Sequence, residues 1–256
     1  MNPHQCRIAL RPRGTLEVLD LAVILVRARH GPLARMLLVT VLPVWVVCVA
    51  LCVLTDGHWA VLAVPLLVGP VLQAPFTVLA GRLLFAEQIT VREVVGDLWG
   101  RAPALVASWV LKIGALAASS LTCFYAWPLL QAALMYTSEA ALLERVGTGR
   151  GLRRTLRLAG GHPGAALVGA GAWYAFVAWF AVVAEVGGQQ LVGFVLQLGH
   201  PFGQLVEGQV TPYLVLGLLL AQPAYAVVRL LLYVDVRTRV EGWDLQVSLR
   251  ALGLAA

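Results

Sequence analysis

The chain has 256 residues, of which 60% are hydrophobic and 12% are charged, and its mean hydropathy is +0.82. A soluble domain carries roughly 25% charged residues, so this composition excludes an ordinary water-exposed surface. The formal net charge of +6 is explained by membrane topology, and no nucleic-acid recognition motif accompanies it. We therefore expect membrane lipids, and not nucleic acid, around the protein.

Six apolar runs approach the roughly 20 residues that a membrane-spanning helix needs. They cover residues 34–55, 59–81, 103–123, 126–144, 164–185 and 211–234. The runs are continuous and lack the period-two alternation of barrel strands. The apolar run at 21–26 is too short for a cleaved signal, so the first span is expected to act as a signal anchor. The sequence predicts an all-α integral membrane protein with six transmembrane helices, forming a single membrane domain over residues 1–256.

Among the connections between these spans, only alternate ones contain basic residues. Residues 56–58, 124–127 and 185–210 contain no lysine or arginine. The positive-inside rule then places the N- and C-termini in the cytoplasm. The arginine-rich composition indicates a bacterial source, and hence the cytoplasmic (inner) membrane. Segment 187–210 is too polar to span, and we expect a short helix on the outer surface there.

Three charged segments share one layout, and they begin at Thr15, Thr90 and Thr148. Each combines an amphipathic helical pattern with a proline at the entrance to the next span. Threonine is expected to cap each helix start, and each helix is expected to lie in the cytoplasmic membrane interface. Together with the hairpins that follow, they predict three parallel repeat units, over about 10–86, 87–145 and 146–246.

Three stretches carry a family resemblance. Residues 10–39, LRPRGTLEVLDLAVILVRARHGPLARMLLV, resemble the N-terminal start of a large group of bacterial six-span proteins. Residues 229–246, RLLLYVDVRTRVEGWDLQ, resemble their C-terminal signature, and residues 139–164 look like their central loop. The group is similar to the membrane domain of some bacterial glycerophosphodiester phosphodiesterases. The resemblance implies a helical membrane domain without the diesterase catalytic domain.

Polar side chains inside the predicted spans form a candidate intramembrane site. Lys112 and Glu139 are expected at similar depth. Either they form a static ion pair, or Lys112 snorkels toward the inner interface, or the charges line a proton, ion or lipid-headgroup path. Arg229 should need Glu139, Asp235 or a lipid phosphate as its partner. The candidate site also includes Asp235, at the inner end of the last span, and three glutamines. The glutamines, which either join helices or line a polar cavity, are Gln73, Gln131 and Gln222.

A basic stripe and a charged tail lie outside the predicted spans. The stripe consists of Arg150, Arg153, Arg154 and Arg157, and the opposite side of the same helix is expected to consist of Leu152, Thr155, Leu156 and Ala159. It is a candidate surface for anionic lipids or for an acidic protein partner. In the tail, Asp235 and Arg239 stand four residues apart and support continued helix. The tail is either a solvated helix end or a docking surface.

No residue pattern indicates catalysis or metal binding. The four cysteines and five histidines lack ligand spacing, so we expect no metal, no cofactor and no enzyme activity. Our first hypothesis is a non-enzymatic integral membrane subunit, a scaffold or assembly partner with protein partners in a membrane complex. The alternative is a transporter or lipid-handling permease with a polar intramembrane site.

Overall fold

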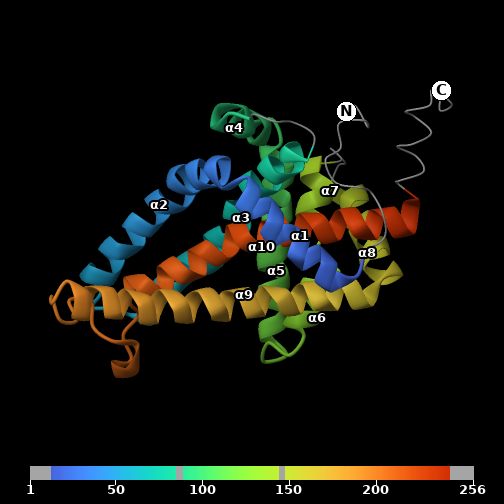
Figure 1. The fold of residues 1–256 in the computed structure, drawn as a ribbon. Coiled ribbons are helices and arrows are strands. Elements are labelled where there is room, and N and C mark those ends of the chain that lie inside the picture. Colours follow the sequence, from blue (N-terminus) through green and yellow to red (C-terminus); the bar gives the residue numbers. More distant parts are fainter. Residues whose placement is uncertain (1–12, 85–88, 144–147, 243–256) are drawn as a thin grey trace. The chain divides into compact units, whose positions relative to one another are not determined.

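The computed structural model describes residues 13–84, 89–143 and 148–242. Every regular element in these ranges is a helix, and none of these residues forms a strand. Figure 1 shows the helices in the order of the chain. The all-α prediction is confirmed for this part of the chain. Residues 1–12 and 243–256 lie outside it, so the predicted location of the two termini stays a prediction.

Within the described ranges, five helical stretches are long and apolar enough to cross a membrane. They are formed by α2 (His30–Leu54), by a 3₁₀ turn (Trp59–Leu62) with α3 (Ala63–Leu83), by α5 (Ala102–Ser120), by α9 (Pro163–Gln189) with a π turn (Gln190–Val195), and by α10 (Pro212–Glu241). The 25 residues of α2 extend about 37 Å, more than the ~30 Å of a bilayer's hydrocarbon core. These stretches coincide with five of the six predicted runs.

The fourth predicted run, 126–144, does not form one continuous helix. It is divided into α6 (Trp127–Ala133) and α7 (Thr137–Leu143), each of seven residues. Between them, the N–H of Met135 donates to the carbonyl of Ala132 at 3.4 Å, and the Thr137 hydroxyl donates to the carbonyl of Leu134 at 2.8 Å. These local bonds compete with the regular helical ladder. Seven residues extend only about 10 Å, so neither helix can cross a membrane alone, and six crossings stay a prediction.

Among the described residues, three charged helices occupy the segments expected to be amphipathic, and each precedes a long helix. They are α1 (Thr15–Ala28), α4 (Val91–Trp99) and α8 (Thr148–Gly161). Their amphipathic character stays a prediction. Thr90 caps α4, because its Oγ1 accepts the N–H of Glu93 and its hydroxyl donates to the Glu93 carboxylate. The cap predicted at Thr15 is wrong, because Gly14 is the N-cap residue of α1 and makes no side-chain cap bond. The threefold repeat and the interfacial location of these helices stay predictions.

The chain packs as two compact units, and each is described by itself. The first comprises Met1–Leu33, Ala74–Gly171 and Ala226–Ala256. Within it, α6 and α7 both pack against α5 and α8. All side chains of Thr137–Leu142 are buried. A Cβ atom at Gly169 would collide with the Met135 side chain, so α9 passes close to the break. The break and α7 therefore lie inside protein, where irregular backbone is tolerated in a membrane.

The second unit comprises Ala34–Gln73 and Ala172–Tyr225. Here α9 and α10 approach closely, because a Cβ atom at Gly217 would lie only 2.7 Å from the backbone carbon of Phe180. The Trp45 indole N–H donates to the carbonyl of Pro212 at 2.9 Å, which ties α2 to the start of α10. The segment 187–210, expected to form a short surface helix, instead begins within the last residues of α9 and continues as the π turn Gln190–Val195.

Candidate functional site

Glu139 and Arg229 form a buried ion pair in the first unit. Glu139 lies in the first turn of α7, and Arg229 lies within α10. Their exposed fractions are 0% and 2%. Nε of Arg229 donates to Oε1 of Glu139 at 2.6 Å. Because a lone charge in such surroundings is costly, pairing offsets part of the desolvation of both groups. Of the three partners expected for Arg229, the structure provides Glu139.

Lys112 approaches the same turn of α7 from α5. Its Nζ donates to Oγ of Ser138 at 2.7 Å, and Ser138 is only 1% exposed. The direct ion pair expected between Lys112 and Glu139 is thus replaced by a hydrogen bond to the neighbouring serine. Sequence reasoning missed Ser138, although its position beside Glu139 in a polar Thr-Ser-Glu triplet was a usable signal.

Two buried oxygen atoms on either side of the helix break lack a hydrogen-bond donor among the described residues. They are Oε2 of Glu139 on α7 and Oε1 of Gln131 on α6. A buried acceptor without a donor costs roughly 1–3 kcal/mol, and native proteins commonly satisfy such groups with water or a ligand. The interrupted segment therefore offers acceptor sites to a molecule that can donate hydrogen bonds.

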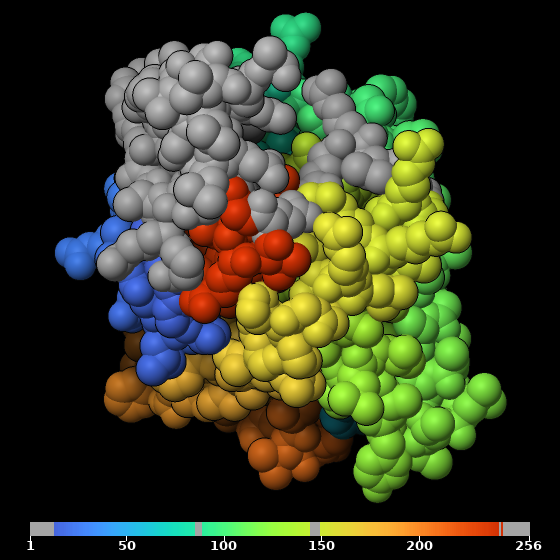
Figure 2. Space-filling model, turned by 90° about the vertical axis from the view of Figure 1, so that its right-hand side faces the viewer, coloured from blue at the N-terminus to red at the C-terminus, as the bar shows by residue number. Residues whose placement is uncertain are grey.

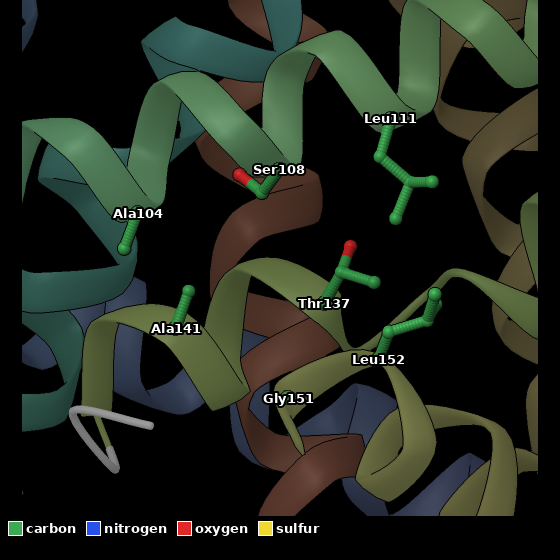
Figure 3. A pocket seen from close by; sticks show the side chains of 7 residues that line it. All are labelled: Ala104, Ser108, Leu111, Thr137, Ala141, Gly151 and Leu152. Atoms are coloured by element: carbon green, nitrogen blue, oxygen red, sulfur yellow. The ribbon is translucent and has the colours of Figure 1, made fainter. Parts of the chain in front are cut away.

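A small cavity adjoins this segment between α5, α7 and α8. Its volume is about 20 Å³, which is room for about one water molecule. Figure 3 shows Leu111 of α5 and Thr137 of α7 projecting toward each other across it. The hydroxyls of Ser108 and Thr137 already donate to carbonyls of their own segments, so each retains acceptor capacity. This cavity can hold a water but is too small for a larger solute.

Two of the three predicted glutamines meet in the second unit. Nε2 of Gln73 donates to Oε1 of Gln222 at 2.7 Å, and both side chains are buried. Nε2 of Gln222 donates to the carbonyl of Leu218 at 3.2 Å. The next carbonyl, that of Leu219, lacks its usual helical donor because Pro223 has no backbone N–H. Gln131 belongs to the first unit, so the convergence of all three glutamines stays a prediction.

Asp235 binds the segment that precedes α1. Its Oδ1 accepts the backbone N–H of Arg13 at 2.7 Å, and its Oδ2 accepts Nε of Arg239 at 2.9 Å. Arg239 also donates to the backbone carbonyl of Arg13. Both backbone groups of Arg13 are therefore held by one acid–base pair on α10. The Arg237 guanidinium lies 5.7 Å from the centre of the Tyr233 ring, a cation–π distance.

The four arginines of the predicted basic stripe lie on α8. Arg150, Arg153 and Arg157 are exposed, whereas Arg154 is half-buried. Thr155 and Ala159 are buried on the opposite side as the pattern predicts, but Leu156 is 46% exposed. The buried side is instead completed by Gly151 and Leu158. The stripe therefore exists, with its apolar side rotated relative to the prediction.

A second polar network, in the second unit, was not predicted. The Thr211 hydroxyl donates to the Glu185 carboxylate, and Gln189 donates to the same group at 3.3 Å. Nδ1 of His200 lies 2.8 Å from Oε1 of Gln189. The signals were the four-residue spacing of Glu185 and Gln189 and the Thr-Pro start of α10. The network ties the connection between α9 and α10 to both helices.

Among the described residues, no group of three His, Cys, Asp or Glu side chains could hold a metal ion. No protein-family model, no curated protein and no solved structure matches the chain. The resemblance to the diesterase membrane domain therefore stays a prediction, and the polar groups described above carry the functional argument.

Proposed function

We propose that the protein is a permease of the bacterial inner membrane that handles a polar solute, an ion or a lipid headgroup at the interrupted segment α6–α7. This is the alternative of the two functions expected from the sequence. The observation that carries it is Glu139, a fully buried carboxylate with one oxygen bound to Arg229 and the other without a donor among the described residues. Transporters commonly form their substrate sites at discontinuous helices, and an intramembrane ionisable residue marks a functional site by default.

The charges around Glu139 indicate what kind of molecule the site would take. Lys112 and Arg229 bring two positive charges and Glu139 brings one negative charge, so the ionised group has a net charge of +1. The free oxygen of Glu139 needs a hydrogen-bond donor, whereas the ammonium of Lys112 attracts an acceptor or an anion. A molecule with both functions, such as a zwitterion or a hydroxylated anion, would satisfy both requirements.

The non-enzymatic scaffold remains the second candidate, because several polar groups already satisfy one another. Gln73 binds Gln222, and Asp235 binds Arg13 and Arg239. Such pairs join helices without requiring a substrate. In that case the Glu139–Arg229 pair would also be structural, and the protein would act through partners in a membrane complex.

Access of water to α7 distinguishes these two functions. Ser138→Cys would be introduced into a variant that lacks the four native cysteines, and Ala140→Cys, on the opposite side of the same helix, would be the matched control. Both residues are at most 1% exposed. The folded proteins, in lipid nanodiscs, would be treated with small membrane-impermeant methanethiosulfonates of either charge.

A permease predicts that Ser138→Cys reacts in the folded protein and Ala140→Cys does not. The anionic reagent should react faster than the cationic one because of the net positive charge. Gel filtration would verify that each variant is folded, and reaction in SDS would verify that each thiol is competent. If neither cysteine reacts until SDS is added, the permease proposal fails and the scaffold is favoured.

A further inference from the structure

The exposed side of α8 is a positively charged surface. Figure 2 shows α8, in yellow, at the surface of the molecule on the side turned to the viewer. Its exposed arginines are Arg150, Arg153 and Arg157, and its buried residues include Gly151, Thr155 and Leu158. At 100° per residue, the centre of the arginine side lies about 135° around the helix from the centre of the buried residues. The packing of α8 on the protein therefore directs its charges outward.

These charges are not neutralised along their own helix. Segment Thr148–Gly161 contains no acidic residue. Arg150 and Arg153 make no ion pair within the part of the chain that the structure describes. The other charged helices differ, because Glu17 of α1 pairs with Arg13, and Glu93 and Asp97 of α4 pair with Arg82. Among the three, α8 therefore retains the strongest attraction for an external anion.

The position of α8 in the chain indicates which anion is available to it. Only His162 separates α8 from α9, which begins at Pro163 and is long and apolar enough to cross a membrane. A helix joined so closely to a span lies near the level of the lipid headgroups. Arg150 and Arg153 are three residues apart, so their side chains are neighbours on the helix surface. Guanidinium groups bind phosphate oxygens through paired hydrogen bonds.

We propose that the arginine side of α8, centred on Arg150 and Arg153, binds the phosphate group of anionic phospholipids. Exposed Leu156 flanks the arginines and can contact the outer part of the acyl chains. The assignment does not rest on the permease function, because it uses none of the buried groups of α7. It would anchor α8, which packs against α5, α6 and α7, to the lipid surface.

The test measures binding of a fluorescent phosphatidylglycerol to the full-length protein in neutral detergent micelles. Each basic residue near an anionic surface contributes about 1 kcal/mol, so the double change Arg150→Gln/Arg153→Gln should weaken binding about 10- to 30-fold. Arg92→Gln, which removes an exposed arginine from α4, should change binding less than about twofold. Arg150→Lys/Arg153→Lys keeps the charges but loses the paired hydrogen bonds of the guanidinium groups, so its affinity should lie between those of the wild type and the double glutamine variant.

Competition identifies the source of the phosphate. Unlabelled phosphatidylglycerol should displace the probe, whereas phosphatidylcholine and millimolar inorganic phosphate should not. Equal binding by wild type and the double glutamine variant would overturn the proposal. Equal displacement by phosphatidylcholine would show that the charge is not recognised, and full displacement by inorganic phosphate would show a site for the free ion. Displacement by an acidic peptide but not by phosphatidylglycerol would assign the surface to a protein partner and overturn the lipid assignment.

Discussion

Glu139 of α7 and Arg229 of α10 are 90 residues apart in sequence and form an ion pair of 2.6 Å in the interior of the first unit. The pair connects a seven-residue helix, too short to be stable alone, to one of 30 residues. Arg229 therefore helps to hold the interrupted segment in place. The same turn of α7 also receives Lys112 through Ser138, so three segments meet at this point.

The bond between Lys112 and Ser138 predicts energetic coupling between these two residues. Lys112→Met and Ser138→Ala should be coupled by about 0.6–1.7 kcal/mol, the range for interhelical hydrogen bonds in membranes. Reversible unfolding in mixed micelles by SDS would measure it. Ser119→Ala is the matched control, because Ser119 is equally buried and bonds only to the carbonyl of Leu116 in its own helix. Coupling of Lys112 to Ser119 as strong as to Ser138 would contradict the described contact.

Asp235→Asn should release the segment that precedes α1. The carboxylate accepts the Arg13 N–H and the Arg239 side chain, and hydrogen bonds to charged groups contribute about 1.5–3 kcal/mol. We expect faster hydrogen exchange at the Arg13 amide and a stability loss of about 1–3 kcal/mol. Asp20→Asn makes the same change of charge at an exposed position of α1 and should leave both unchanged. An unaltered exchange rate at Arg13 in the Asp235 variant would show that the bond does not hold this segment.

Gly217→Ala should separate α9 and α10 in the second unit. The added methyl would meet the backbone of Phe180 and Ala181, which cannot rotate away as a side chain can. The expected loss of unfolding free energy is about 1–3 kcal/mol, as for other overpacked positions. At Gly171 of α9 nothing lies within 4 Å of an added Cβ, so Gly171→Ala should be neutral or slightly stabilising. A Gly217→Ala variant as stable as the wild type would mean that the helices are further apart than described.

Hydrophobic runs and their caps made much of the secondary structure predictable. Five long helices follow from continuous apolar runs, and α1, α4 and α8 follow from charge placed at helical spacing. The break between α6 and α7 was not predicted, because residues 134–136 are Leu-Met-Tyr and contain no proline or glycine. Local hydrogen bonds of the following Thr137 favour the break, and a hydropathy pattern does not register them.

The members of the candidate site were easier to predict than their partners. Lys112, Glu139 and Arg229 stand out because charge is rare in an apolar run. The equal depth expected for Lys112 and Glu139 suggested that the two side chains form a pair. Depth, however, determines only the position of a residue along its helix. The direction in which a side chain points depends on how the helices are rotated against each other. Packing brings Arg229 to Glu139 and Ser138 to Lys112. The rotation of the helices that produces these contacts cannot be inferred from a single sequence.

The ion pair at the interrupted segment is the central claim, and a double-mutant cycle on Glu139→Gln and Arg229→Gln tests it most directly. Removing one partner of a buried pair typically costs about 3–5 kcal/mol, because the other charge stays buried and uncompensated. We therefore predict that each single change is strongly destabilising in mixed micelles and that the double variant loses clearly less than the sum of both. Strictly additive losses would mean that the two side chains do not interact and would contradict the account.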